Sequence, residues 1–359
     1  MTAPTPPDAP SIKLVEDAAP ATLAGFHAVI DTRSPSEFAE DHIPGALNLP
    51  VLSDAERAEV GTLYARSRFE ARRLGAALVA RNIAAHLEGA LADRPSDFKP
   101  LVHCWRGGQR SHAMATVLSQ VGWRTALLVG GYRTYRHRVQ AALYDTGPEL
   151  KAVLIDGNTG TGKTDLLHRL AARGLQVIDL EGLANHRGSL FGARGPQPGQ
   201  KLFESRLLAQ IEALDPTRPV VVEAESSKVG ERMVPPILWR AMQAAPRIEL
   251  VATPQDRARF LVGAYRDIVA DRAALDAVLD RLPAHASPER RNAWAAMADA
   301  GDFESLASAL MTFHYDPAYA RSAKKETRRL LGTVPVTPLD EARQEAAADA
   351  VAQLVATLC

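Results

Sequence analysis

A chain of 359 residues is longer than one hydrophobic core normally supports, so two or more domains are expected. The 42 basic and 42 acidic residues balance, so there is no overall field for nucleic acid, and any such binding must come from local patches. Two cysteines exclude a disulfide scaffold. Without a signal-peptide pattern or a membrane-spanning apolar run, the sequence predicts a soluble, cytoplasmic protein that does not bind membranes.

After a proline-rich lead over residues 1–11, which we expect to be disordered, strands and helices alternate. A strand is predicted at 26–30 and a short helix at 35–40, with Ser34 as its N-cap and Glu37 completing a capping box. The Pro44-Gly45 pair predicts a turn before a short strand at 46–49. The stretch 54–91 then repeats its apolar residues near the helical period, and a buried strand is predicted at 126–129.

Cys104 follows the end of a predicted buried strand and precedes a helix predicted at 111–121. Gly107 and Gly108 can adopt positive φ angles, which would turn backbone N–H groups inward to form a nest for negative charge. Arg106 and Arg110 add formal positive charge, which favours the thiolate, the nucleophilic form of a cysteine. The alternative is a cysteine that packs as a small apolar residue.

The segment 12–144 resembles a rhodanese domain. The resemblance rests on Asp31 and Arg33 with Glu37-Phe38, on His42-Ile43-Pro44-Gly45-Ala46 with Asn48 and Pro50, on the Cys104 loop, and on Val129-Gly130-Gly131-Tyr132. It implies that Cys104 carries sulfur or selenium as a persulfide or selenosulfide, with Arg106, Gly107, Gly108 and Arg110 supporting the loop. The helical stretch between Pro50 and Pro100 is an insertion relative to a minimal rhodanese.

Residues 145–150 contain Gly147-Pro148 and are a predicted linker to a second domain over 151–253. A strand at 151–156 leads directly into Gly157-Asn158-Thr159-Gly160-Thr161-Gly162-Lys163-Thr164, a complete phosphate loop, and a helix follows. Backbone N–H groups at the helix N-terminus would wrap a phosphate, with Lys163 on its outer oxygens and Thr164 able to hold Mg²⁺. Further alternation of strands and helices predicts a parallel sheet.

Ligands of such sheets bind at the carboxyl ends of the strands, where Asp179, Glu181, Glu223 and Glu225 are expected. We expect these residues, with His186 and Arg187 of the glycine-punctuated loop 185–192, to form a substrate or magnesium site. The alternative for Glu223 and Glu225 is pairing with a nearby Lys or Arg. No metal ligand set is certain from the sequence.

Residues 254–359 are predicted to form a helical C-terminal region. Two basic stretches are candidate nucleic-acid contacts, one just after the rhodanese-like core and one near the C-terminus: Arg133, Arg136, Arg138, Lys324, Lys325, Arg328 and Arg329. Tyr132 and Tyr135 are expected either to stack on an unstacked base or to pack against the Cys104 domain. For the second stretch the alternative is a solvated helix face.

The whole chain is thus predicted to be α/β, with a rhodanese-like domain followed by a P-loop NTPase-like parallel α/β domain and a helical C-terminal region. This pair, the Cys104 loop, the phosphate loop and the stretch 179–189 closely resemble the bacterial tRNA 2-selenouridine synthases. The resemblance implies conversion of wobble 2-thiouridine in tRNA to 2-selenouridine through an S-geranyl intermediate. Selenophosphate and geranyl diphosphate are then co-substrates, no cofactor is tightly bound, Mg²⁺ is a candidate ion, and a selenophosphate-supplying enzyme is a candidate partner.

Two other functions are compatible with the motifs. His103-Cys104 and Arg110-Ser111 also match the signature of cysteine-dependent phosphatases, in which Arg110 would clamp the phosphate oxygens. The other alternative is a P-loop kinase or NTPase with a non-catalytic rhodanese module. The phosphatase function leaves the second domain unexplained.

Overall fold

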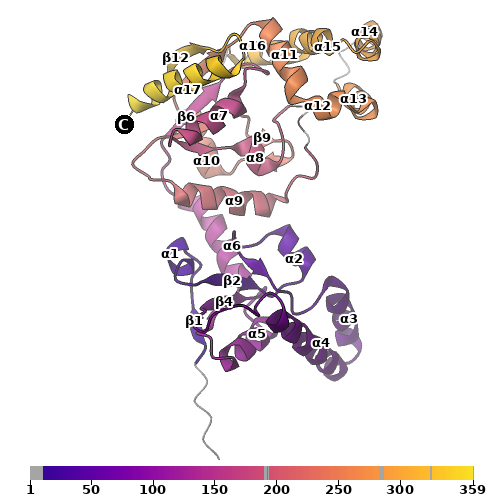
Figure 1. Cartoon of the computed structure of the whole chain (residues 1–359), viewed down its shortest axis with the longest axis vertical. Coiled ribbons are helices and arrows are strands. Elements are labelled where there is room, and N and C mark those ends of the chain that lie inside the picture. The colour runs from indigo at the N-terminus through magenta and orange to yellow at the C-terminus, as the bar shows by residue number, and fades with distance from the viewer. Residues whose placement is uncertain (1–10, 190–191, 193, 283–286, 324–325, 359) are drawn as a thin grey trace, which may run out of the picture. The chain divides into compact units, whose positions relative to one another are not determined.

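The computed structural model describes residues 11–189, 192, 194–282, 287–323 and 326–358. The chain divides into two compact units, and each is described here by itself (Figure 1). The first holds Met1–Thr146 and Glu204–Glu212, and the second holds Gly147–Phe203 and Ala213–Cys359. Each unit contains a parallel five-stranded sheet, so the predicted α/β fold class is confirmed.

The sheet of the first unit has the strand order β1-β5-β4-β2-β3 with parallel neighbours. Its strands are β1 (Lys13–Val15), β2 (Ala28–Asp31), β3 (Leu47–Asn48), β4 (Pro100–His103) and β5 (Ala126–Leu128). All four residues of β4 are buried, as in a strand covered on both faces. Asp31 pairs in register with His103, so β2 and β4 end at one edge, next to Cys104.

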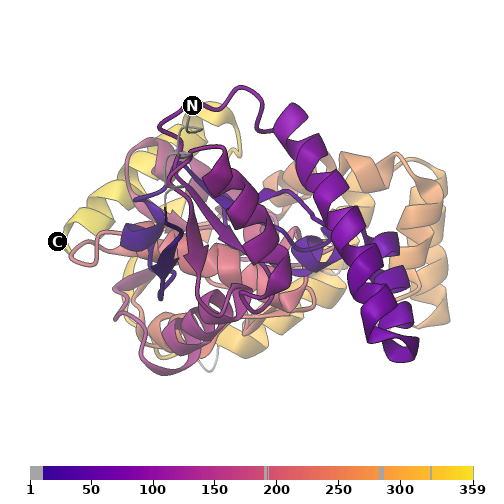
Figure 2. The ribbon, with the colours of Figure 1, turned by 90° about the horizontal axis from the view of Figure 1, so that it is seen from below.

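The helices of the first unit are α1 (Pro20–Leu23), α2 (Pro35–Glu40), α3 (Asp54–Arg66), α4 (Arg68–Glu88), α5 (Gln109–Gln120), α6 (Tyr132–Gln140) and the π-helix η1 (Ala141–Asp145). The predicted capping box of α2 is present. The helical pattern over 54–91 forms two helices, which lie against each other as Figure 2 shows. They separate at Ser67, whose extended backbone ends α3 and whose hydroxyl caps α4.

The sheet of the second unit has the order β12-β11-β6-β8-β7, again with parallel neighbours. Its strands are β6 (Ala152–Asp156), β7 (Gln176–Ile178), β8 (Val220–Glu223), β11 (Arg247–Val251) and β12 (Leu330–Pro335), and β9 (Lys228–Val229) and β10 (Arg232–Met233) form a separate antiparallel pair. Because β6 is central and β8 is its neighbour, the phosphate loop after β6 lies beside the carboxyl end of β8.

The helices of the second unit are α7 (Lys163–Ala172), α8 (Leu180–Ala184), α9 (Gln200–Ala213, most of which groups with the first unit), α10 (Pro236–Ala244), α11 (Pro254–Ala264), α12 (Arg266–Val269), α13 (Arg272–Leu279), α14 (Pro288–Asp299), α15 (Phe303–Leu310), the π-helix η2 (Met311–Tyr315), α16 (Asp316–Ala323) and α17 (Glu341–Ala356). The orange helices α11 to α15 lie together in Figure 1, and α12 to α15 share an apolar core that includes Leu275, Trp294 and Leu306. Among the described helices, none is both long enough and apolar enough to cross a membrane.

The C-terminal region that the sequence predicts to be helical is mostly helices, but it also contains one strand that the sequence analysis did not predict. Residues 330–335 form β12, a parallel edge strand beside β11, and α17 packs on the sheet through Ala347, Ala348 and Val351. The stretch Leu330–Pro335 is short and contains both Gly332 and a proline, so it carries a weak strand signal. It becomes a strand because β11 offers it a hydrogen-bonding edge.

Candidate functional site

Cys104 begins the loop between β4 and α5. Its Sγ atom accepts hydrogen bonds from the backbone N–H of Gly108 and the hydroxyl of Ser111, each at 3.2 Å. Both donors stabilise negative charge on sulfur. The side chain is 3% exposed, yet it lines a pocket together with Arg57, Arg106 and Arg110. This arrangement favours a sulfur that acts on a small anion over one that only fills the core.

The glycines around this loop have different roles. Gly107 has a positive φ of 66°, whereas Gly108 has a φ of −97°, so only one of the two adopts the expected left-handed backbone. Gly131 approaches the loop so closely that a Cβ atom there would lie 2.3 Å from the carbonyl oxygen of Cys104. The Gly130-Gly131 pair before α6 therefore lets the backbone of α6 pack directly under the Cys104 loop.

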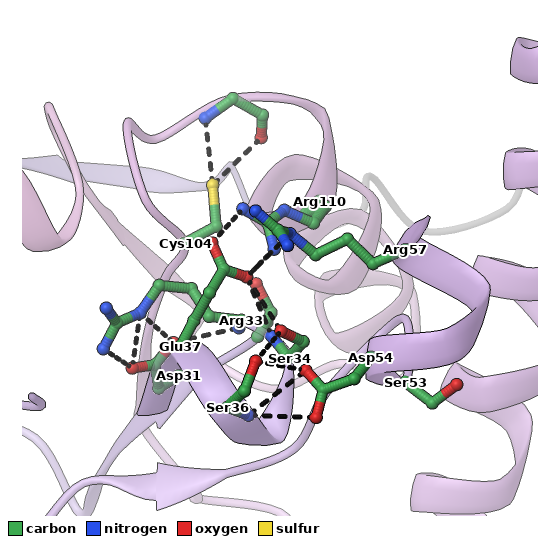
Figure 3. A network of polar contacts seen from close by, with 12 residues as sticks. Asp31, Arg33, Ser34, Ser36, Glu37, Ser53, Asp54, Arg57, Cys104 and Arg110 are labelled. Atoms are coloured by element: carbon green, nitrogen blue, oxygen red, sulfur yellow. Dashed lines mark hydrogen bonds and ion pairs between the residues drawn. The ribbon is translucent and has the colours of Figure 1, made fainter. Parts of the chain in front are cut away.

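Arg110 forms a two-pronged pair with Glu37 of α2. Its Nη1 atom donates to Oε2 of Glu37 at 2.6 Å, and Arg57 of α3 lies 3.4 Å from the same oxygen (Figure 3). Burial would raise the pKa of Glu37, but the hydrogen bonds and charge of Arg110 lower it overall. Arg110 thus supports the loop through Glu37. A phosphatase mechanism would require it to leave this carboxylate.

The motif residues Asp31 and Arg33 form a buried ion pair beneath the site. Arg33 donates from Nε to both carboxylate oxygens of Asp31 and from Nη2 to Oδ2, and its guanidinium lies 4.1 Å from the ring centre of Tyr132. Tyr132 and Tyr135 are only 2% and 4% exposed, so the structure supports the packing alternative, and base stacking by these two rings is not available. Burial raises the pKa of both phenols.

The candidate tRNA arginines differ in their surroundings. Arg133 is exposed on α6. Arg136 is paired with Glu204 and Arg138 with Glu212, and both are largely covered, so either would have to leave its carboxylate to contact the tRNA backbone. Near the C-terminus, Arg329 is exposed while Arg328 is paired with Glu326. Lys324 and Lys325 lie outside the described residues.

The phosphate loop has the backbone that its glycines predict. Gly157, Gly160 and Gly162 all have positive φ, and a Cβ atom at Gly157 would lie 2.8 Å from the carbonyl oxygen of Leu250. Lys163 and Thr164 begin α7. The Lys163 ammonium donates to the carbonyl of Gly157 at 2.8 Å. A phosphate-sized anion can therefore meet the helix N-terminus and this ammonium together.

Two carboxyl groups contact Thr164, and a third, that of Glu225, lies next to one of them, Glu181. The Thr164 hydroxyl lies 2.6 Å from Oε1 of Glu223 and 3.0 Å from Oε2 of Glu181. Burial and the charge of Glu225 raise the pKa of Glu181 to about 7. Burial and Glu181 raise the pKa of Glu223 well above its ordinary value, and burial raises that of Glu225 against the opposing charge of Lys163. A proton or a bound cation among these three carboxyl groups would reduce the repulsion between their negative charges.

The donor set fits Mg²⁺ in type, because that ion prefers hydroxyl and carboxylate oxygens. The Oε2 atom of Glu223 is buried and has no hydrogen-bond partner among the described residues. The described part of the chain nevertheless has no cluster of three or more acidic, histidine or cysteine residues arranged as a metal site. Magnesium binding therefore stays a prediction.

A pocket of about 960 Å³, open to solvent, lies over the phosphate loop and is lined by Lys163, Thr164, Glu181, Glu225 and Arg187 among others. Arg187 donates to Asp267 at 2.9 Å, while its Nη1 atom has no hydrogen-bond partner in the part of the chain that is described. Burial opposes the charge of Lys163, but Tyr319 and the three glutamates raise its pKa. The pocket thus offers two cations to a diphosphate.

Two predicted site residues have other roles. Asp179 caps α8 by accepting from the N–H of Gly182 at 2.7 Å and also pairs with His168. The ring of His186 accepts from the N–H of Gly188 and supports the loop, and burial lowers its pKa. Neither residue lines the phosphate-loop pocket. Leu190 and Phe191 of the same loop lie outside the described residues.

Sequence reasoning missed the helical contribution to this pocket. Tyr265 at the end of α11, Tyr315 of η2 and Tyr319 of α16 line it, and the Tyr319 ring lies 5.9 Å from the Lys163 ammonium. Arg257 of α11 donates to the carbonyl of Thr159 and pairs with Asp316 at 2.7 Å. No contiguous motif marks these residues, because the pocket gathers them from helices far from the loop in sequence.

Family models match both parts of the chain in which these two sites lie. The model of the rhodanese-like domain matches residues 14–138, and the model of the tRNA 2-selenouridine synthase AAA domain matches residues 150–277. A tRNA 2-selenouridine synthase of Bordetella petrii is 33% identical over 342 residues, covering 84% of this chain and 88% of the relative. One from Bordetella bronchiseptica is 33% identical and covers 87% of this chain and 93% of the relative.

A further relative from Cupriavidus necator, also named tRNA 2-selenouridine synthase, is 39% identical over 249 residues. The similarity thus includes the Cys104 loop and the phosphate loop in one alignment over most of the chain. The chain belongs to the tRNA 2-selenouridine synthase family.

Proposed function

We propose that this protein converts wobble 2-thiouridine of tRNA into 2-selenouridine, using selenophosphate and geranyl diphosphate. One observation carries the proposal: an alignment over most of the chain with tRNA 2-selenouridine synthases includes both a sulfur site and an anion site with their motifs intact. A rhodanese-like module alone would not need the phosphate loop. An NTPase alone would not need Cys104.

The first proposed step is alkylation at the phosphate loop. The thiocarbonyl sulfur of the base attacks C1 of geranyl diphosphate, an S–C bond forms, and the C–O bond breaks with its electron pair leaving on diphosphate. Loss of the N3 proton then gives a neutral S-geranyl base. The N–H groups at the start of α7, with Lys163 and Arg187, stabilise the departing charge. A bound Mg²⁺ would supply further charge for the diphosphate oxygens.

The second step replaces sulfur by selenium. Alkylation turns the thiocarbonyl into a group that can leave as geranylthiol, so a selenium nucleophile can add at C2 and break the C2–S bond. We propose that Cys104 carries this selenium as a selenosulfide. The hydrogen bonds from Gly108 and Ser111 to Sγ, and the cations of Arg57 and Arg106 in the same pocket, suit loading from an anionic donor.

The carrier role of Cys104 requires a reductant, whereas direct transfer from selenophosphate does not. Attack of the Cys104 thiolate on selenium breaks the Se–P bond and leaves the electron pair on phosphorus, which departs as phosphite. After the loaded selenium adds to C2, the S–Se bond must be cleaved by two electrons from a thiol reductant. Direct addition of selenophosphate to C2, followed by hydrolysis of the Se–P bond, gives phosphate and needs no reductant. Phosphorus NMR of the products therefore separates a carrier from a residue that only positions the donor.

The test is mass spectrometry of tRNA nucleosides from cells that lack the endogenous enzyme and express each variant. Wild type should yield 2-selenouridine. Cys104→Ala should accumulate S-geranyl-2-thiouridine, and Lys163→Ala should leave 2-thiouridine unmodified. Cys359→Ala serves as the cysteine control and should match wild type. Full selenation by Cys104→Ala would remove the carrier role, and release of phosphate from ATP without tRNA would favour the NTPase alternative.

A further inference from the structure

An apolar pocket lies directly beside the phosphate-loop pocket in the second unit. It is lined by residues of α11, α12, α13, α15 and η2 and is partly open to solvent; α11 to α15 lie together in orange in Figure 1. Its walls are almost entirely carbon, contributed by residues such as Leu275, Phe303, Leu306 and Leu310. A lining of this composition is typical of a site for a small apolar group.

The two pockets adjoin each other. Five residues line both of them: Thr159, Ser189, Leu261, Tyr265 and Tyr315. Thr159 belongs to the phosphate loop itself, so the apolar space opens at the point where a bound phosphate would sit. A ligand that fills both pockets must therefore be anionic at one end and apolar at the other.

The lining of the two pockets changes from polar to apolar at Tyr265. Its hydroxyl lies 2.8 Å from that of Ser189, and the guanidinium of Arg187 lies 4.8 Å from its ring centre. On the other side of this ring the lining consists of aliphatic and aromatic side chains from α13 and α15. The purine of a nucleotide would leave its ring nitrogens without partners among these carbons, which carries a large penalty.

We propose that this apolar pocket holds the hydrocarbon chain of the prenyl diphosphate and sets its length. The assignment rests on the proposed alkylation step and adds to it the place of the chain. The diphosphate lies on the loop that ends in Lys163 and Thr164, C1 lies near Tyr265, and the chain runs toward α15. The rings of Tyr265 and Tyr315 at the junction suit the cationic character that an allylic carbon gains as diphosphate leaves.

Ala307 is the specificity-determining position in this geometry. It lies on α15 with Phe303, Leu306 and Leu310, which repeat at helical spacing and all face the pocket. Its side chain is the smallest of the four, so a large residue there would occupy the far end of the space. Leu306 and Leu310 are core residues, and shortening them would also cost stability.

The experiment measures binding to the full-length protein without tRNA, by calorimetry. The ligands are inorganic diphosphate, dimethylallyl diphosphate, geranyl diphosphate, farnesyl diphosphate and ATP. Each buried methylene is worth about fourfold in affinity. Wild type should therefore bind geranyl diphosphate roughly 100-fold more tightly than dimethylallyl diphosphate, which is one isoprene unit shorter, because part of that unit is buried.

Ala307→Phe should remove most of the gain from dimethylallyl to geranyl while leaving inorganic diphosphate affinity unchanged. Ser305→Phe adds the same ring to an exposed position of the same helix and should behave as wild type. Lys163→Ala should weaken every diphosphate ligand. Because Ala307→Phe and Ser305→Phe differ only in which face they occupy, their circular dichroism melting curves separate loss of fold from loss of the pocket.

The possible outcomes separate this inference from the proposed function. Chain-dependent binding that Ala307→Phe abolishes supports the pocket even if tRNA is never alkylated. Normal alkylation of tRNA by Ala307→Phe with an unchanged chain-length preference overturns the pocket and leaves the function intact. ATP binding as tight as that of geranyl diphosphate and insensitive to Ala307→Phe also overturns it.

Discussion

The hydroxyl of Thr164, the last residue of the phosphate loop, lies 2.6 Å from Oε1 of Glu223 at the end of the neighbouring strand β8. The sheet order creates this contact, because β8 pairs with β6 and their carboxyl ends share one edge. Glu223 is 1% exposed, and its second oxygen has no partner in the described part of the chain. A buried carboxyl with a free oxygen beside a phosphate loop is a position where a cation would be stabilised.

Glu223→Gln should remove the dependence of geranyl diphosphate binding on magnesium. The amide keeps the shape of the side chain but cannot supply the negative charge that a divalent ion needs. We expect wild type to bind at least about tenfold more tightly with MgCl₂ than with EDTA, and the variant to show no such gain. Glu231→Gln, at an exposed carboxylate between β9 and β10, is the matched control. An unchanged magnesium effect in Glu223→Gln would contradict the prediction that the Glu223 carboxylate binds magnesium.

Binding of diphosphate without magnesium should weaken as pH rises through about 7. Below this pH Glu181 is largely protonated because its pKa is about 7, and above it a negative charge appears beside the anion. Diphosphate itself also changes its protonation state with pH. The decisive comparison is therefore between wild type and Glu181→Gln, whose affinity for diphosphate should vary less with pH. Identical profiles for the two proteins would show that Glu181 does not titrate in this range.

The same pKa shift predicts a stability effect. The folded-state pKa of Glu181 is raised above its ordinary value of 4.5, so the folded protein binds more protons than the unfolded chain between about pH 4.5 and 7. The free energy of unfolding should therefore fall as pH rises through this window, and Glu181→Gln should fall less. Urea unfolding at pH 5, 6, 7 and 8 measures this difference, and a steeper fall in the variant would have the wrong sign.

Glu37→Gln should destabilise the first unit, because it leaves Arg110 half of its two-pronged pair and removes the charge that Arg57 also faces. The pair is partly exposed, so the loss should be about 1–3 kcal/mol. A double-mutant cycle with Arg110→Met in chemical denaturation measures the coupling. If the two changes are additive, Arg110 is free to bind substrate and does not hold the loop.

Arg133→Ala should weaken tRNA binding and reduce the salt slope by about one, because one phosphate contact is lost. Arg133 is exposed, whereas Arg136 is largely covered and paired with Glu204. Arg136→Ala should instead lower the melting temperature and change the salt slope little. Fluorescence anisotropy with tRNA at several salt concentrations checks both. The reverse pattern would mean that Arg136 leaves Glu204 to contact tRNA.

The sequence by itself determined the local chemistry of both units. The Cys104 loop and the phosphate loop are each one continuous stretch of sequence. Their glycines adopt backbone angles that few other residues adopt, so recognising the motif also predicts the geometry of the loop. The capping box of α2 and the alternation of strands and helices are equally local. For these reasons the fold class and family followed from the residues alone.

Only the tertiary structure decided which distant residues share a pocket. It brought Glu223 to Thr164 and Glu37 to Arg110, and it turned Asp179, which also follows a strand, into a helix cap. Strand order and side-chain burial set these contacts, and neither can be inferred from the periodicity of the sequence. The edge strand β12 and the apolar pocket likewise depend on partners far along the chain, since a weak strand needs an open sheet edge and a pocket needs walls from several helices.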